Sequence, residues 1–254
     1  MSTDLPSKRL ALVTGTSAGI GAAVATRLLE RGWSVIGIAR RPARFAQPGY
    51  IHLNLDLGDI EVLVASMNQQ VAPRLSDAWK RVGLVNNAGT TGMPGPLPQL
   101  EARDLQRVYA VNTVAPVWLM SFFVRHCPEG TALRIVNVSS GVAHRPAPGL
   151  SAYNGSKAAL LSAGLTLAAE WDEANAHAPA PRDAAILSYE PHVVDTGMQH
   201  GARSLTPEEF PWVSRFQDYK RRGQLVPPEG PAQDIASFLE ADREPRFSEP
   251  RFRP

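Results

Sequence analysis

Residues 10–21 read LALVTGTSAGIG, an apolar run followed by a glycine-rich turn and the start of an apolar helical pattern. The run Leu10–Val13 has the continuous apolar character of a strand that is buried on both faces. From about Ile20 to Arg31 apolar residues recur with helical spacing, and Gly32 marks the end of that helix. The stretch therefore predicts a strand, a tight turn and a helix in immediate succession.

A turn of this kind suits the pyrophosphate of a dinucleotide. The pyrophosphate requires close approach of the backbone and free N–H groups at a helix N-terminus, and glycine allows both. The alternative is an ordinary glycine turn that makes a tight helix contact. We favour dinucleotide binding because the turn follows the first strand of the chain. We assign the contacts to six residues: Gly15, Thr16, Ser17, Gly19, Ile20 and Gly21.

Apolar runs of strand length alternate with helical patterns along the rest of the chain. Further strands are expected at Trp33–Ala39, Ile51–Leu55, Val82–Val85, Arg134–Val138 and Ala184–Tyr189, and a seventh is only weakly indicated in the tail, Glu240–Pro254. Helices are expected at Glu61–Leu75, Glu101–Arg125 with a kink or break at Pro116, and Ser151–Asn175. This alternation predicts the α/β class, with a single Rossmann-type doubly wound parallel sheet and helices on both faces. No linker or repeat interrupts it, so residues 1–254 are expected to form one domain.

The composition of the 254-residue chain argues against several kinds of partner. The formal net charge is only +2 and no block of like charge occurs, so neither nucleic acid nor a membrane is an expected partner. The single cysteine, Cys127, excludes an intrachain disulfide and a cysteine metal site, and no metal is expected. No apolar segment is expected to reach the roughly 20 residues that span a bilayer. A cytoplasmic protein is therefore expected.

The end of the second expected strand bears on the choice of dinucleotide. A site for NAD places an acid here for the ribose 2′-hydroxyl, whereas a basic residue accommodates a 2′-phosphate. No acid lies between Gly32 and Tyr50, and this interval contains Arg40, Arg41 and Arg44. The sequence therefore favours NADP(H), with Arg40 and Arg41 as the phosphate contacts. The alternative is a solvated basic loop, which would not discriminate between the two nucleotides.

Residues 153–157, YNGSK, place a tyrosine and a lysine on one face of the last long helix. An unperturbed tyrosine has a pKa near ~10, and an ammonium group one turn away favours the phenolate. Tyr153 could then exchange a proton near neutral pH with the help of Lys157. The alternative is a surface Tyr–Lys pair.

Two further polar residues are candidates for the same site. Ser140 follows the fifth strand, where ligands of open α/β sheets bind, and its hydroxyl could hold a substrate oxygen. It could also be a turn or cap serine, as we interpret Ser139. Asn112 lies in an apolar helix, where a buried amide is costly unless it forms hydrogen bonds. A structural hydrogen bond and a part in a proton relay are equally open for Asn112.

Together these residues resemble the classical form of the short-chain dehydrogenase/reductase family over about residues 8–200. The resemblance rests on the glycine spacing, on NNAG at residues 86–89, and on a catalytic tetrad in matching order and spacing: Asn112, Ser140, Tyr153 and Lys157. It implies hydride transfer between a nicotinamide and a carbonyl carbon. Tyr153 would protonate the oxygen that Ser140 holds. Lys157 would lower the tyrosine pKa and bind the nicotinamide ribose, and Asn112 would order a water that leads protons to Lys157.

The same resemblance implies further cofactor contacts, at Asp56, Leu57, Asn87, Ala88, Gly89, Tyr153, Lys157, Pro191, Val194 and Thr196. The sequence departs from the family at Pro191-His192, where Pro-Gly is usual. His192 either occupies a turn that suits glycine better or lines the substrate pocket.

Residues 194–199, 216–220 and 223–225 resemble the branch of the family that contains sepiapterin reductase and benzil reductase. That branch uses NADPH to reduce one carbonyl of a vicinal dicarbonyl. A diketone or aromatic ketone, or the corresponding alcohol, is therefore the expected small-molecule partner, ahead of a pterin. Residues of about 195–228 show no strand pattern and are rich in Met, Phe, Trp and Pro, which predicts a lid over the substrate. Its apolar walls are expected to be Met198, Phe210, Trp212 and Phe216. By analogy with the family, a homodimer or homotetramer is expected.

Two other functions remain open. A redox sensor could bind NADP(H) without turnover, but it would have no use for the acid that Tyr153 provides. Another reaction of the same family, such as sugar epimerisation, is disfavoured by the glycine spacing and the short chain.

Overall fold

A computed structural model describes residues 8–43, 45, 47–75, 79–176, 182–242 and 244–253. Within these residues, seven parallel strands form one sheet in the order β3-β2-β1-β4-β5-β6-β7. The strands are β1 (Arg9–Thr14), β2 (Ser34–Ala39), β3 (Tyr50–Asn54), β4 (Arg81–Asn86), β5 (Ala132–Val138), β6 (Ala184–Tyr189) and β7 (Phe247–Ser248). The strand order reverses direction between β1 and β4, and this switch point is where open α/β sheets bind ligands.

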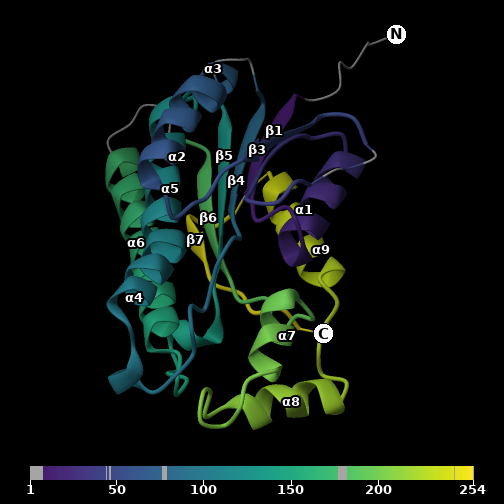
Figure 1. Cartoon of the computed structure of the whole chain (residues 1–254). Coiled ribbons are helices and arrows are strands. Elements are labelled where there is room, and N and C mark those ends of the chain that lie inside the picture. The colour runs from purple at the N-terminus through teal and green to yellow at the C-terminus, as the bar shows by residue number, and fades with distance from the viewer. Residues whose placement is uncertain are drawn as a thin grey trace.

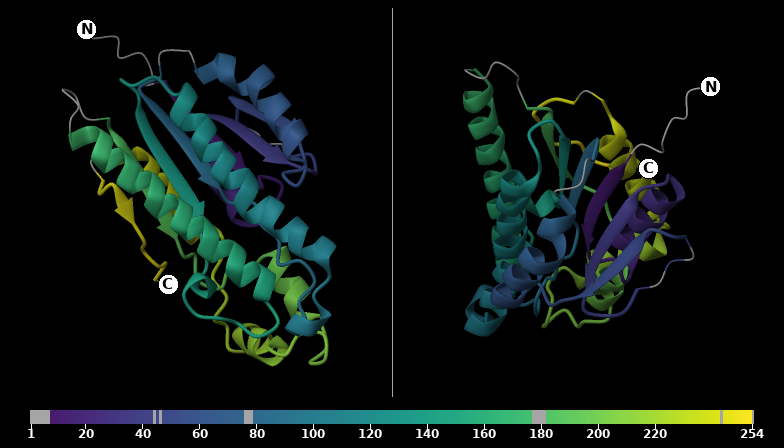
Figure 2. Two further views of the ribbon diagram at one scale, coloured as in Figure 1. Left: turned by 90° about the vertical axis from the view of Figure 1, so that its left-hand side faces the viewer. Right: turned by 90° about the horizontal axis from the view of Figure 1, so that it is seen from above.

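Helices cover both faces of this sheet, as the sequence predicts (Figure 1). The helices are α1 (Gly19–Glu30), α2 (Ile60–Ser66), α3 (Ala72–Leu75), α4 (Ala102–Tyr109), α5 (Ala115–His126), α6 (Ser151–Ala176), α7 (Gly197–Arg203), α8 (Val213–Arg221) and α9 (Glu229–Glu240). Figure 2 shows α1 and α9 on one face, and α2 to α6 on the other. Each face has its own apolar core, one around Leu28 and Ile235, the other around Leu119 and Leu160. The doubly wound α/β fold is thereby confirmed.

The expected break at Pro116 takes a different form. A π-helical stretch, η3 (Ala110–Val114), joins α4 to α5, and Pro116 lies in the first turn of α5. Proline has no N–H to donate to the preceding turn. The π-helical stretch changes the helical register just before it, and the helix continues without a break from Ala102 to His126. The expected helix at residues 61–75 is likewise divided by a π-helical stretch, η1 (Met67–Val71).

The continuous helix Ala102–His126 is long and apolar enough, by length and composition, to cross a membrane. This was not expected from the sequence. In the fold, however, half (50%) of its most apolar window is buried. Phe122 and Phe123 are fully buried in the core beside the sheet. The apolar composition is therefore explained by packing against the sheet.

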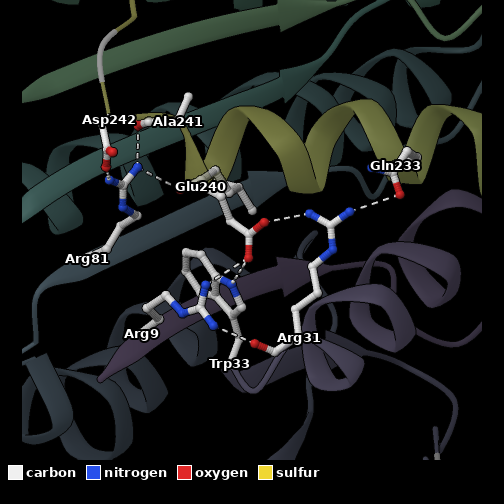
Figure 3. A network of polar contacts seen from close by, with 9 residues as sticks. Arg9, Arg31, Trp33, Arg81, Gln233, Glu240, Ala241 and Asp242 are labelled. Atoms are coloured by element: carbon white, nitrogen blue, oxygen red, sulfur yellow. Dashed lines mark hydrogen bonds and ion pairs between the residues drawn. The ribbon is translucent and has the colours of Figure 1, made fainter. Parts of the chain in front are cut away.

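A polar network lies at the end of the sheet where β1 begins and α9 ends (Figure 3). Glu240 accepts hydrogen bonds from Arg9 at 2.8 Å, from Arg31 at 2.6 Å and from the Trp33 indole at 3.2 Å. Arg81 of β4 donates to the Asp242 carboxylate at 2.9 Å. These contacts fix α9 against β1 and α1, far from the turns that carry the candidate site.

Candidate functional site

The predicted site residues follow the carboxyl ends of adjacent strands and are thereby brought to one edge of the sheet. Gly15 follows β1, Asn87 follows β4, Ser140 lies just beyond β5, and Pro191 lies just beyond β6. The helical pair α7 and α8 lies beyond the same edge, at the bottom of Figure 1.

The turn between β1 and α1 has the backbone geometry that its glycines suggest. Gly15 and Gly19 have φ angles of 80° and 58°, in the left-handed region that favours glycine. A Cβ atom added at Gly21 would lie 2.4 Å from the Gly15 carbonyl oxygen. No described side chain caps the start of α1, and its first turn contains no acid. The N–H groups there are available for an anion, so these residues fit a dinucleotide pyrophosphate.

A set of hydrogen bonds joins this turn to the one that follows β4. The Thr14 hydroxyl accepts from the backbone N–H groups of Asn87 and Ala88, at 2.9 and 3.0 Å. The Asn87 side chain donates to the Thr14 carbonyl oxygen at 2.8 Å, and a Cβ atom at Gly15 would lie 2.7 Å from that side-chain nitrogen. Asn87 therefore holds the two turns together. Thr14 was not predicted as a site residue, although it begins the glycine motif.

Basic residues lie near the expected adenosine end of the site. Arg40 and Arg41 are exposed immediately after β2, and Arg44 lies outside the described residues. Asp56 is not free, because Arg107 of α4 donates two hydrogen bonds to its carboxylate, at 2.7 and 2.8 Å. Burial alone would raise the Asp56 pKa, but hydrogen bonds from Arg107 and Gly58 and the charges of Arg107 and Arg40 outweigh it and lower that pKa. Leu57, beside it, is buried.

Ser140 lies beside Tyr153, close enough for its hydroxyl to act on the pKa of the phenol. Burial raises the pKa of the Tyr153 phenol, and the Ser140 hydroxyl opposes this only in part. Ser140 also accepts a long hydrogen bond of 3.5 Å from the Val142 N–H, as a cap of the short helix η4 (Gly141–Ala143). Ser139 is buried, and its N–H donates to the Tyr189 carbonyl oxygen at 2.8 Å. Ser140 is therefore both the cap of η4 and a neighbour of Tyr153.

Lys157 is buried, with 4% of its surface exposed. Its ammonium group donates to the Val138 carbonyl oxygen at 2.7 Å. Burial lowers the Lys157 pKa from 10.5 to about 8. The charge of Lys157 was expected to lower the Tyr153 pKa. In the structure burial prevails and the phenol keeps its proton.

Asn112 lies inside the π-helical stretch η3 and is fully buried. Its side-chain oxygen accepts from the Thr90 N–H at 2.9 Å, and its nitrogen donates to the Thr90 carbonyl at 2.8 Å and to the Ser156 hydroxyl at 3.0 Å. Ser156 in turn donates to the Tyr153 carbonyl oxygen at 2.8 Å. These bonds give Asn112 the structural role that the sequence left open, and they connect it to the helix of Tyr153. Ser156 was not predicted, although it lies within the YNGSK motif.

Gly89 separates Asn112 from the buried lysine. A Cβ atom added at Gly89 would lie 3.4 Å from the Asn112 side-chain oxygen and 3.8 Å from the Lys157 nitrogen. Gly89 therefore lies beside both polar groups.

The turn after β6 contains His192, at the position where the sequence lacks the glycine that is usual in the family it resembles. His192 has a φ angle of 64° and is the one non-glycine residue with positive φ in the described part of the chain. Such a backbone costs energy for any residue but glycine. Burial and nearby Arg251 lower the His192 pKa, against an opposing effect of Glu190. Beyond it, Thr196 reaches the glycine turn, since a Cβ atom at Gly19 would lie 3.1 Å from its methyl group.

The expected lid consists of α7, α8 and their connections, joined at its base. Val194 and Val226 form an isolated parallel bridge, in which the Val226 N–H donates to Val193 at 3.0 Å. Phe210 is fully buried in a small cluster with Leu150, against which Tyr153 packs. Phe210 was expected to be an apolar wall of the pocket, but here it is the centre of the cluster that holds the lid in place. Met198 is 41% exposed.

Comparisons with known proteins agree with this arrangement. The family model for the short chain dehydrogenases matches residues 9–205. Benzil reductase ((S)-benzoin forming) of Bacillus cereus is 32% identical over 246 residues, which cover 94% of this chain and 96% of that protein. The enzyme of the same name from Bacillus subtilis is 29% identical over 92% of this chain and 95% of its own. A solved structure of 3-ketoacyl-(acyl-carrier-protein) reductase from Brucella melitensis, complexed with NADH, has a TM-score of 0.76 and 22% identity, covering 97% of this chain and 98% of its own.

Proposed function

The chain belongs to the short-chain dehydrogenase family of oxidoreductases, and on that basis we propose that it is an NADPH-dependent carbonyl reductase or alcohol dehydrogenase. The observation that carries the proposal is the buried Tyr153 phenol, with the Ser140 hydroxyl beside it and the buried Lys157 ammonium 5.8 Å from the centre of its ring. A phenol that burial keeps protonated is a suitable acid for a carbonyl oxygen that becomes an alkoxide.

In the proposed reaction a carbonyl compound is reduced to an alcohol. A nicotinamide held in the cofactor site would supply the hydride for the carbonyl carbon. Ser140 holds the carbonyl oxygen through its hydroxyl, and Tyr153 gives that oxygen its proton, so that hydride and proton together make the alcohol. Oxidation of an alcohol follows the same path in reverse.

The buried polar groups behind Tyr153 complete the proposed mechanism. Lys157 binds the nicotinamide ribose through its ammonium group and returns a proton to the Tyr153 phenolate. Asn112, fixed by Thr90 and Ser156, orients the groups around Lys157. Gly89 lies beside both Asn112 and Lys157, and a water held by these polar groups would connect Lys157 to solvent.

The preference for NADP(H) rests on the charge at the end of β2. Arg40 and Arg41 are exposed there, and no acid stands between Gly32 and Tyr50 to bind a ribose 2′-hydroxyl. Guanidinium groups form strong bonds with phosphate, whereas an acid at this place would repel a 2′-phosphate. Asp56 is occupied by Arg107, so its carboxylate does not offset this preference.

The proposed substrate is an aromatic ketone or vicinal dicarbonyl compound. Two benzil reductases are similar over more than nine-tenths of this chain. Two aromatic residues of the proposed lid, Trp212 and Phe216, pack against the same apolar cluster as Tyr153. An apolar, aromatic lining favours a flat hydrophobic ketone. We further propose a single cytoplasmic domain that forms a homodimer or homotetramer.

A substrate panel tests this function directly. Benzil and related diketones, simple aromatic ketones and sepiapterin would each be offered with NADPH and with NADH, and nucleotide oxidation followed by absorbance. We expect turnover of the diketones or aromatic ketones with NADPH. NADPH binding without turnover of any carbonyl would support the redox sensor instead.

A further inference from the structure

The hydroxyl group of Tyr50 joins the glycine turn to the outer strand β3. It lies 2.9 Å from the Thr16 hydroxyl and 2.9 Å from the Nδ1 atom of His52. Thr16 is 1% exposed, so this contact lies beneath the turn. Burial raises the Tyr50 pKa, against a smaller opposing effect of the Thr16 hydrogen bond, and the phenol is protonated at neutral pH.

Gly37 makes this contact possible. It interrupts the apolar run of β2. A Cβ atom added at Gly37 would lie 2.1 Å from the Tyr50 hydroxyl and 2.7 Å from the Thr16 hydroxyl. A glycine inside a strand often marks a place that another group approaches closely, and here that group is the hydroxyl pair.

The ring of Tyr50 makes a second contact, with the segment that follows the two exposed arginines. Phe45 packs edge-on against Tyr50, with ring centroids 4.4 Å apart and an interplanar angle of 64°. Phe45 lies four residues after Arg41 in the sequence. Tyr50 therefore contacts, through its hydroxyl, the turn that fits the pyrophosphate and, through its ring, the segment after Arg40 and Arg41.

We propose that Tyr50 is a positioning residue of the cofactor site. Its hydroxyl holds Thr16, and with it the glycine turn, in the form that receives the pyrophosphate. Its ring holds the segment after β2, and with it the arginines assigned to the 2′-phosphate. This inference rests on the proposed NADP(H) site and assigns to that site a residue for which the motifs give no role.

The two contacts of Tyr50 predict different results for its hydroxyl and its ring. Tyr50→Phe removes only the hydroxyl, so it should weaken NADPH and NADH alike, because both carry the same pyrophosphate. One hydrogen bond corresponds to about a three- to tenfold rise in Kd. Tyr50→Ala also removes the ring contact and should weaken NADPH more than NADH. Both constants would be measured by titration of nucleotide fluorescence.

The variants of Thr16 decide whether the hydroxyl pair is responsible. Thr16→Val should raise the Kd of both nucleotides as Tyr50→Phe does. Thr16→Ser should bind both nucleotides as the wild type does, because it keeps the hydroxyl. The double variant Tyr50→Phe, Thr16→Val should bind no more weakly than either single variant. These measurements decide the matter even if Tyr50→Ala fails to fold.

Tyr189→Phe is the matched control. It deletes a phenol hydroxyl that donates to Asp234 of α9 at 2.7 Å. It should lower Tm and leave the Kd of NADPH unchanged. A Tyr50→Phe protein that binds NADPH as tightly as the wild type would overturn the role of Tyr50 alone. A wild-type protein that binds neither nucleotide would overturn the proposed function and this inference together.

Discussion

The ammonium nitrogen of Lys157 lies 5.8 Å from the centre of the Tyr153 ring, and both residues come from α6. The lysine is held in this place by the Val138 carbonyl oxygen at the end of β5. Burial acts in opposite directions on the two groups, raising the pKa of the phenol and lowering that of the ammonium. Near neutral pH the pair is therefore a neutral phenol beside a charged ammonium, which suits an acid that must be reprotonated.

The first prediction concerns the pH dependence of carbonyl reduction. The Tyr153 pKa is raised and that of Lys157 is lowered to about 8, so Lys157 is the first of the two to lose its proton as the pH rises. We expect kcat/KM for ketone reduction to be level below this pH and to fall above it. Initial rates with saturating NADPH between pH 6 and about 10 would measure this. A profile that stays level to the alkaline end would show that neither proton is required.

The second prediction concerns the stability cost of the buried ammonium. The Lys157 pKa is about 8 in the folded state, whereas the ordinary pKa of a lysine is 10.5. The folded state therefore binds fewer protons between these values, and the cost of burying the charge is complete below pH 8 and is relieved as the pH rises to 10.5. The difference between the two pKa values corresponds to a cost on the order of 3 kcal/mol in the free energy of unfolding.

Lys157→Met removes this titration while it keeps an apolar stem of similar length. We expect the free energy of unfolding of the wild type to rise relative to that of Lys157→Met between pH 8 and 10.5. Urea unfolding of both proteins at several pH values would give the difference. A difference that does not change with pH would contradict a buried charged lysine.

The parts of this molecule that depend on local sequence could be predicted. The bounds of β6, Ala184–Tyr189, agree with the expected strand because six consecutive buried residues identify a central parallel strand. The glycine turn and the Tyr153–Lys157 pair were also found from spacing alone. In each case the residues that interact are close together in the chain.

Other features could not be predicted because they depend on contacts between distant segments. Tyr50 and Thr16 are 34 positions apart, and Arg107 and Asp56 are 51 apart. Only the glycine in β2, Gly37, could have indicated that a side chain crosses that strand. Phe210 looked like a pocket wall because aromatic content alone does not distinguish a wall from a packing core.

The third prediction concerns cofactor choice. If Arg40 binds the 2′-phosphate, NADPH should bind roughly ten- to a hundredfold more tightly than NADH, because charged hydrogen bonds contribute about 1.5–3 kcal/mol. Arg40→Asp should reverse the preference, since the carboxylate would repel the phosphate and accept from the ribose hydroxyl. Titration calorimetry with both nucleotides measures this. Equal dissociation constants in the wild type would refute the assignment.

The fourth prediction concerns the proposed lid, Asp195–Leu225. The segment is joined to the rest at the Val194–Val226 bridge and held by the cluster around Phe210. We expect it to open without ligand and to close over the substrate, so NADPH with a ketone inhibitor should protect it from proteolysis. Cleavage sites would be located by mass spectrometry. Identical cleavage of this segment with and without ligands would count against a lid.

The fifth prediction, on Tyr153→Phe, tests the central claim, that Tyr153 is the acid. The variant keeps the ring, which packs against the cluster around Phe210, and removes only the hydroxyl and its proton. The decisive measurement is kcat for ketone reduction, with the Kd of NADPH measured on the same preparation. We predict an unchanged Kd and a kcat lower by at least about 10²–10⁴-fold, the contribution of general acid catalysis. Near-normal kcat with intact NADPH binding would show that the proton comes from another group, and the proposed mechanism would be wrong.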